Sequence, residues 1–542
     1  MGRSSRRRKS PATSTSDGPE HDRRWRVILF VIIFAAAFLS VGYYRHQGGS
    51  GYPLDDSWIH LTFARNVASG AGFGANPHEP TPGATSPLWV FFLAPGFLFG
   101  PAHAVWPWVL ATCFLGAAGV LCAILVHVLR RTISPDDDAV PGRARLSPGW
   151  PGFVCGLAVV WSGPLVWSAA GAMEVPLFAS LIIAALLVYA RSGLPGWRNG
   201  VAWGGAAGFA ALARPEGLLL AVVLAFVSLS RMRRGAMVEA GVGLAACAVV
   251  YSPSVLFCLS TSGRVFPNTF YAKTTALVAG PPDAAFLGGA ARFFAGAAPV
   301  ALLGFFLGVA VLGWMLRRRA PVHALVALAA FAVGLPLAYA AMGRTFLFAG
   351  LAGNFGRYLY PVFPPALVLG FWGLACVTDV TPRRWVAAAG RGLMIVALVV
   401  SITKAVDRVE LYRHNVRDIN SMQVAMAHRL RSALPAGSLV AANDVGALAY
   451  FTDFRVLDLE GIISTHTMKV LEDAGPRGRE RAHYELLNSE RPAALVVFPQ
   501  WFAGVLTRLG DAARPIEVIE NRRNITAGGS RLVAFRLDWG QP

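Results

Sequence analysis

The stretch LDDSWIHLTFARN, Leu54 to Asn66, governs the interpretation of this chain, because it places two adjacent carboxylates directly after the first long apolar segment. Asp55 and Asp56 are followed by the spacing of apolar residues that is typical of an amphipathic helix. Two roles for the pair follow from the sequence. One aspartate can cap the helix N-terminus, which stabilises a helix by ~1 kcal/mol. The other is then free to accept a proton or to bind a metal ion at a membrane surface.

The composition predicts an integral membrane protein. Of the 542 residues, 55% are hydrophobic and only 15% are charged, and the mean hydropathy is +0.49. Soluble globular domains are less apolar than this. Between Trp25 and about Lys404, apolar runs long enough to cross a hydrocarbon core of ~30 Å alternate with short loops.

The net charge of +19 follows the expected membrane topology. Runs of Lys and Arg fall on alternate loops, which is the positive-inside pattern. Little excess charge remains on the C-terminal part of the chain, so no basic face is left to bind nucleic acid. The runs contain Arg6, Arg7, Arg8, Lys9, Arg23, Arg24, Arg130, Arg131, Arg231, Arg233, Arg234, Arg317, Arg318, Arg319, Arg383 and Arg384.

About eleven spans follow from the length rule, and this odd number places the N-terminus in the cytoplasm and the C-terminus outside. The expected localisation is the plasma (inner) membrane, with a multi-pass topology. The spans are predicted at about 27–44, 108–129, 153–170, 175–190, 201–213, 218–229, 238–259, 300–316, 324–342, 359–377 and 385–402.

Three segments lie outside these spans. Residues 1–24 are rich in Ser, Arg and Pro and predict a disordered basic cytoplasmic tail before a transmembrane module at 25–403. The first outer loop, 45–107, contains a short apolar run, Leu88 to Phe99, that indicates an interfacial helix. The six cysteines lie in apolar segments, so neither a disulfide framework nor a cysteine metal site is indicated.

From residue 404 to residue 542 the polarity is that of a soluble domain. A long amphipathic helix is predicted through Leu434, followed by short β-branched runs that alternate with helical patterns. The predicted strands are 438–444, 455–459, 494–499 and 532–537. The whole chain is therefore predicted to be an α-helical polytopic membrane protein with a small C-terminal extracytoplasmic α/β domain.

Single charges on the predicted outer loops are the candidate site residues, because topology does not explain them. All are expected at the same end of their helices, where they could converge on a cleft that suits an anionic, lipid-tethered substrate. Each cation can either extend to the membrane interface from a helix end or bind a phosphate group. Each acid can either interact favourably with a helix dipole or contact substrate. The cations are Arg214, Lys273 and Arg357, and the candidate substrate contacts are His60, Arg65, Glu174 and Glu216.

Several ordered motifs resemble one known family. The run from Leu54 to Trp89 is similar to the first outer loop of GT-C fold glycosyltransferases, especially the subgroup with the mycobacterial terminal arabinofuranosyltransferase and related mannosyltransferase-like membrane enzymes. The motifs GAMEVPLF, ARPEG, FPNTFYAK, RYLYP, VAANDVGALAYF and RVLDLEG continue the resemblance over most of the chain.

The resemblance implies an acid in the first outer loop as catalytic base and two interfacial helices in that loop. Carried over, Asp55 and Asp56 match the acidic pair, with Asp55 preferred as base. Arg214, Lys273 and Arg357 match basic positions near the donor phosphate. A divalent metal ion at Asp55 or Asp56 stays open. Trp58, Ile59 and His60 depart from the residues that usually follow the acids in this family.

The expected function is inverting transfer of a sugar from a polyprenyl-phosphate donor to a cell-envelope glycan, lipid or protein on the extracytoplasmic face. The alternative from another class is a lipid or glycolipid transporter or flippase. Transporters usually place ionisable groups near the membrane midplane between repeats, whereas here the charges gather at one face. A scaffold whose external domain binds a partner is a third interpretation.

Overall fold

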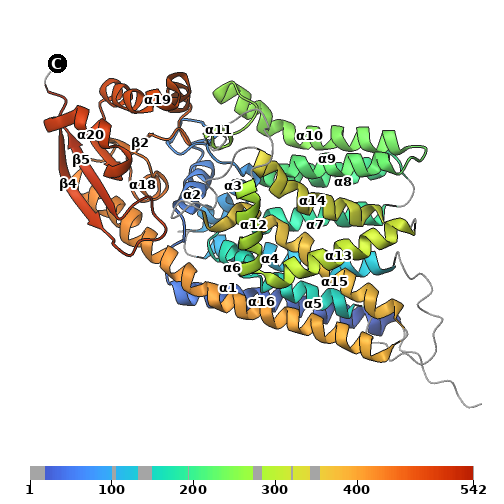
Figure 1. Cartoon of the computed structure of the whole chain (residues 1–542). Coiled ribbons are helices and arrows are strands. Elements are labelled where there is room, and N and C mark those ends of the chain that lie inside the picture. The colour runs from blue at the N-terminus through green and yellow to red at the C-terminus, as the bar shows by residue number, and fades with distance from the viewer. Residues whose placement is uncertain are drawn as a thin grey trace, which may run out of the picture.

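The computed structural model describes residues 19–100, 105–131, 149–192, 195–272, 284–318, 322–341, 354–381 and 383–540. Long helices lie side by side in one bundle, and the C-terminal α/β domain sits at one end of it (Figure 1). The predicted disordered tail, 1–24, falls mostly outside the described residues, but its last residues already belong to helix α1, which begins at Pro19.

Each predicted span falls on a described helix or, at 153–170, on a pair of helices. Seven are long and apolar enough to cross a membrane, and the bent pair α5 and α6, at 52°, makes an eighth. Helices α7 and α9 are apolar but shorter, so the count of eleven stays a prediction. The bundle consists of α1 (Pro19–Gly48), α4 (Trp106–Arg131), α5 (Trp150–Val160), α6 (Gly163–Ala170), α7 (Val175–Arg191), α8 (Trp197–Ala213), α9 (Gly217–Ser230), α10 (Ala236–Ser262), α13 (Pro299–Arg317), α14 (His323–Ala341), α15 (Phe363–Val380) and α16 (Arg384–Ile419).

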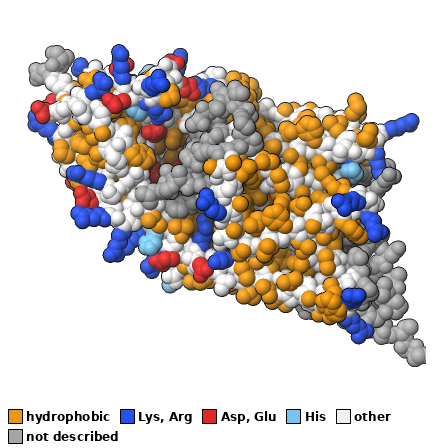
Figure 2. Space-filling model, viewed as in Figure 1, with side chains coloured by type: hydrophobic (Ala, Val, Ile, Leu, Met, Phe, Trp, Pro, Cys, Tyr) orange, Lys and Arg blue, Asp and Glu red, His pale blue; other side chains and the backbone are white. Residues whose placement is uncertain are grey.

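The outer surface of the bundle is apolar. Large side chains such as Val249, Leu303 and Phe306 are more than 60% exposed. Hydrophobic side chains cover the bundle on the face that Figure 2 shows, and Lys and Arg gather at the end opposite the α/β domain. A helix that is hydrophobic all round belongs in a membrane, because water would not solvate such a surface. The protein is therefore an integral membrane protein.

Close packing of α8 on α10 depends on small residues. Gly200, Gly204 and Gly208 recur every four positions and form one stripe, and a Cβ at each would meet atoms of α10. Small residues let membrane helices approach closely enough for dispersion contacts to hold them together.

We expect Gly204→Leu to lower the free energy of unfolding by ~1–3 kcal/mol, because the new side chain would be forced into the backbone of Gly243. Gly205→Leu is the matched control, since a Cβ there meets nothing within 4 Å. Thermal unfolding of the detergent-solubilised protein measures both. Equal losses in the two variants would contradict the packing argument.

Helix α16 runs without a break from the membrane into the C-terminal domain. The sequence predicted a span at 385–402 and a separate amphipathic helix after it, but both belong to α16, which continues through a π-helical turn, Asn420–Val424, into α17 (Ala425–Ala433). One continuous helix thus connects the bundle to the domain.

The C-terminal domain contains a five-stranded mixed sheet in the order β2-β1-β3-β5-β4. Strand β1 (Leu439–Ala442) pairs in parallel with β2 (Arg455–Asp458) and β3 (Ala494–Val497), and β5 (Arg531–Leu537) pairs antiparallel with both β3 and β4 (Ala513–Glu520). The predicted α/β class is confirmed, but β4 was missed. This edge strand is largely exposed and contains Pro515 at an irregularity, so its apolar residues alternate over too short a stretch to predict a strand. The helices are α18 (Gly446–Phe451), α19 (Thr465–Glu490) and α20 (Ala503–Leu509).

Short elements lie between the bundle and the C-terminal domain (Figure 1). The first outer loop forms α2 (Asp55–Ala68) and α3 (Pro87–Leu93), and a 3-10 turn, Ala94–Phe99, extends α3. The predicted short helix at 88–99 is thus present, and Phe91 and Phe99 are exposed on it. Helix α11 (Asn268–Ala272) and the 3-10 segment Asn354–Val362 complete this layer. Helix α12 (Ala284–Ala297) packs on α13 and α14.

Candidate active site

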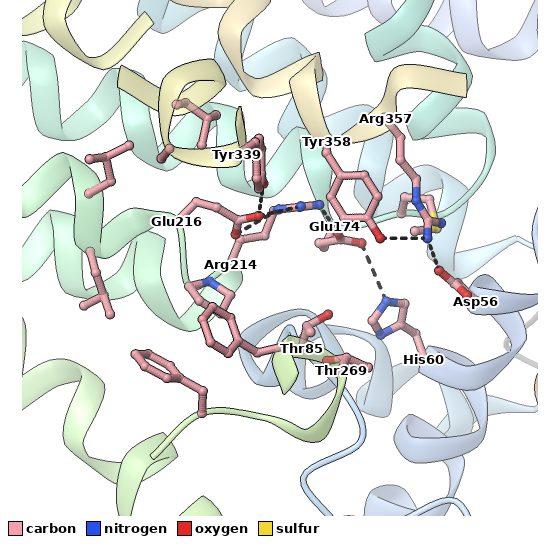
Figure 3. Close-up of a pocket in the computed structure, with 18 residues that line it drawn as sticks. Asp56, His60, Thr85, Glu174, Arg214, Glu216, Thr269, Tyr339, Arg357 and Tyr358 are labelled. Carbon is pink, nitrogen blue, oxygen red and sulfur yellow. Dashed lines mark hydrogen bonds and ion pairs between the residues drawn. The ribbon is translucent and has the colours of Figure 1, made fainter. Parts of the chain in front are cut away.

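A cavity of about 260 Å³ opens where these short elements meet the ends of the bundle helices. Its lining has two parts. One part is apolar and comes from α9, α14, α11 and the segment before α11, with Leu218, Leu219, Phe266, Phe270, Leu335 and Ala338. The other part is ionic, with Asp56, His60, Glu174, Arg214, Glu216 and Arg357 (Figure 3).

Arg214 lies between two glutamates in the ionic part. Its Nη1 lies 2.6 Å from Glu174 Oε1, and its Nη2 lies 2.8 Å from Glu216 Oε1. Glu216 also accepts a hydrogen bond from the Tyr339 hydroxyl. Arg214 precedes Pro215, which disfavours helical backbone in the preceding residue, and its extended conformation ends α8. Arg214 is thus already engaged by two carboxylates.

Asp56 and Arg357 form a second ion pair, with 2.5 Å between Asp56 Oδ2 and Arg357 Nη2. The guanidinium is buried, whereas the Asp56 side chain is 34% exposed. Nη1 of Arg357 has no hydrogen-bond partner among the described residues. A buried, unpaired donor next to a cavity costs free energy unless a ligand satisfies it.

His60 lies one helical turn after Asp56 on α2 and points into the same cavity (Figure 3). Its Nε2 lies 3.6 Å from Glu174 Oε2. Its Nδ1 is buried and lacks a hydrogen-bond partner within the described part of the chain. His60 therefore adjoins the Arg214–Glu174 pair and offers one more polar atom to a ligand.

Asp55 does not line the cavity, although it was the preferred base. Its two carboxylate oxygens accept hydrogen bonds from the backbone N–H groups of Gly446 and Ala447, at 2.6 and 2.7 Å. Burial and the nearby Asp444 raise the pKa of the Asp55 carboxyl, and the two backbone hydrogen bonds oppose that rise. Adjacent residues on a helix point about 100° apart, so only Asp56 faces the cavity.

Two other predicted site residues, Arg65 and Lys273, are not among the described residues that line the cavity. Arg65, a predicted substrate contact, donates hydrogen bonds to the backbone oxygens of Ala449 and Tyr450 and lies outside the cavity lining. Lys273, a predicted phosphate contact, lies outside the described residues. Across the described ranges, no group of three or more His, Cys, Asp or Glu side chains could hold a metal ion.

Four polar lining residues were not predicted: Thr85, Thr269, Tyr339 and Tyr358. Three of them lie inside motifs that the resemblance covers, namely TPGATSP, FPNTFYAK and RYLYP, and motif position was the only available signal. Tyr339 stands alone in an apolar helix and gave no signal at all.

Comparisons with known proteins identify the fold. ArnT from Cupriavidus metallidurans bound to undecaprenyl phosphate matches with a TM-score of 0.57 and 15% identity, over 94% of this chain and 98% of that chain. The oligosaccharyltransferase AglB from Archaeoglobus fulgidus, in complex with an inhibitory peptide and a dolichol-phosphate, gives 0.56 and 12%, over 96% and 75%. Arabinofuranosyltransferase AftD from mycobacteria gives 0.46 and 14%, over 95% and 41%.

The chain therefore has the GT-C fold, which its neighbours, membrane glycosyltransferases, share. A family model described as "Domain of unknown function (DUF8728)" matches residues 410–535, which include the sheet of the C-terminal domain. None of the curated proteins matches the sequence.

Proposed function

We propose that this protein is an inverting glycosyltransferase that moves a sugar from a polyprenyl-phosphate donor to a cell-envelope glycan, lipid or protein. The observation that carries the proposal is the divided cavity, whose apolar part adjoins membrane helices and whose ionic part contains both a carboxylate and a buried guanidinium. A lipid-linked phosphate has the same division between an apolar chain and a charged head. The GT-C neighbours support the same class of reaction.

Asp56 is the base in this proposal. The acceptor hydroxyl gives its proton to the Asp56 carboxylate as its oxygen forms a bond to the anomeric carbon. The bond from that carbon to the phosphate oxygen breaks, and its electron pair stays on the leaving lipid phosphate. Arg357 stabilises this charge through Nη1, the donor that lacks a partner within the described residues. A single displacement inverts the anomeric configuration.

Arg214 has a supporting part in this scheme. Because Glu174 and Glu216 already hold it, we assign it to the structure of the cavity wall rather than to the phosphate. His60 and Glu174 are left to contact the sugar. The alternation of basic loops supports an extracytoplasmic position for the C-terminal domain and the cavity. The proposed donor is accordingly a lipid-linked sugar that has already crossed the membrane.

Transfer is tested with the full-length protein in proteoliposomes and a panel of radiolabelled undecaprenyl-phosphate pentoses and hexoses, with envelope glycan as acceptor. We expect label in the glycan with inverted anomeric configuration. Movement of the labelled lipid between leaflets without any transfer would overturn the proposal in favour of a flippase.

Arg357→Ala should weaken binding of undecaprenyl phosphate about tenfold to a hundredfold, because a hydrogen bond to a charged group contributes ~1.5–3 kcal/mol. Native mass spectrometry measures this affinity. The control is Arg264→Ala, which removes an arginine that pairs with Glu472 and lies outside the cavity lining. Unchanged affinity in Arg357→Ala would remove the phosphate contact from the proposal.

A further inference from the structure

Helix α18 of the C-terminal domain is held at its N-terminus by α2. The first backbone N–H groups of a helix have no partner within the helix. In α18 two of them, from Gly446 and Ala447, donate to the Asp55 carboxylate. A negative charge at this end of a helix is also favourable because it opposes the positive end of the helix dipole.

The other end of α18 is held by the same helix α2. Backbone oxygens at a helix C-terminus also lack partners within the helix. Arg65 donates to the oxygens of Tyr450 and Ala449, at 2.7 and 3.0 Å. At this same C-terminal end of α18, the Trp58 ring packs on the rings of Tyr450 and Phe451, with centroids 5.0 and 4.6 Å apart.

These three contacts lie on one face of α2, and the cavity residues lie on another. At 100° per residue, Asp55, Trp58 and Arg65 fall within about 80° of one another. Asp56 and His60 fall about 100° to 140° from Asp55 in the other direction. A rotation of α2 that loosened the first face would therefore move the second.

Gly446 allows the close approach of α18 to α2. A Cβ at this position would collide with the backbone oxygen of Asp55 and would lie 2.8 Å from its Oδ2. Because the colliding atom is backbone, a side-chain rotation cannot relieve the contact. Substitution of Gly446 thus separates the two helices without changing α2.

A second wall of the cavity contacts the same domain. Asn268 donates to Thr465 Oγ1 at the start of α19, and its backbone N–H donates to the Pro82 oxygen. A Cβ at Gly83 would meet the backbone of Ile462 and Ile463. The neighbouring residues Thr85 and Thr269 line the cavity.

We propose that the C-terminal domain positions the base for transfer: Asp55 and Arg65 bind α18 at its two ends and so fix the orientation of Asp56 and His60 on α2. The expected effect on kcat rests on the proposed function. The docking of α18 on α2 rests on the contacts alone. The family model described as a domain of unknown function covers α18 and the start of α19. The proposal therefore gives a function to this domain.

Hydrogen exchange tests the docking without any substrate. In Asp55→Asn and in Gly446→Ala we expect faster exchange at the amides of residues 445–451. The control, Arg481→Gln, removes only an exposed ion pair with Glu485 on α19 and should leave this exchange unchanged. Unchanged exchange in Asp55→Asn would overturn the docking, whatever the reaction of the protein is.

A double-mutant comparison separates positioning from catalysis. Displacement of a reacting group by about 1 Å can cost a hundredfold in rate, so we expect kcat to fall about tenfold to a hundredfold in Gly446→Ala and in Asp55→Asn, with the affinity for undecaprenyl phosphate kept. The two changes should not add in the double variant, because both release the same contact. Asp55→Glu, which keeps the charge, should recover part of the rate.

If Asp55→Asn abolishes transfer in the Gly446→Ala background as well, Asp55 is itself the base and the positioning role is overturned. Absence of transfer by the wild-type protein would overturn the proposed function. The exchange result would still decide the docking.

Discussion

Asp56→Asn should lower kcat for sugar transfer about a hundredfold to ten-thousandfold, which is the usual contribution of a general base. The amide cannot accept the proton of the acceptor hydroxyl. The substitution leaves the buried Arg357 guanidinium without its carboxylate partner, so we also expect a lower thermal unfolding temperature, and transfer is compared at a temperature at which both the variant and the wild type are folded. Binding of undecaprenyl phosphate should be retained, since Arg357 is left free of its carboxylate partner.

The matched control for this test is Asp407→Asn, which changes an exposed carboxylate on α16 that pairs only weakly with Lys404, at 3.7 Å. Its kcat should equal that of the wild type. Single-turnover transfer measures the chemical step in both variants. Undiminished transfer by purified Asp56→Asn would remove the base from the mechanism. The prediction is most specific as a rank order: kcat for transfer should be lower in Asp56→Asn than in Asp55→Asn.

The main parts of the fold were predictable from local pattern. Apolar length located the helices, because a membrane core imposes one length scale on every span. Alternating β-branched runs located four of the five strands. Two predictions were wrong for the same reason: β4 was missed, and α16 was divided into two helices. The polarity pattern is weak in an exposed edge strand, and it changes along a helix that extends from a membrane into a soluble domain.

The sequence predicted most of the charged residues that line the cavity, but it did not predict which of the two aspartates faces it. The position of lone charges on predicted outer loops selected Glu174, Arg214, Glu216 and Arg357, and all four line one cavity. The choice between Asp55 and Asp56 could not be made, because it depends on Gly446, far away in the chain. Adjacent residues have the same local sequence, so only tertiary structure separates a docking carboxylate from a cavity carboxylate.

In the proposed mechanism, charge balance gives the two arginines of the cavity different roles. Arg214 has a carboxylate on each side, whereas Arg357 has one, and its second terminal nitrogen lacks a partner in the described part of the chain. An anionic ligand can therefore gain a hydrogen bond at Arg357, while at Arg214 it would have to displace a carboxylate. The sequence contexts ARPEG and GRYLYP contain no such information.

Arg214→Met should destabilise the whole protein by ~3–5 kcal/mol, because it leaves the buried Glu174 carboxylate and the partly buried Glu216 carboxylate without their cation. The expected result is a large drop in the thermal unfolding temperature in detergent and a loss of monodisperse protein. Adding Glu216→Gln should recover part of the stability, since one buried charge is then removed.

The same two measurements separate this role from a phosphate clamp. Arg357→Ala should weaken undecaprenyl phosphate binding with a smaller change in unfolding temperature, because Asp56 keeps access to water. Arg214→Met should lower the unfolding temperature strongly and change the affinity for undecaprenyl phosphate less. If Arg214→Met unfolds at the wild-type temperature and only its lipid-phosphate affinity falls, then its two glutamates are exchangeable partners and Arg214 belongs with Arg357 at the donor phosphate.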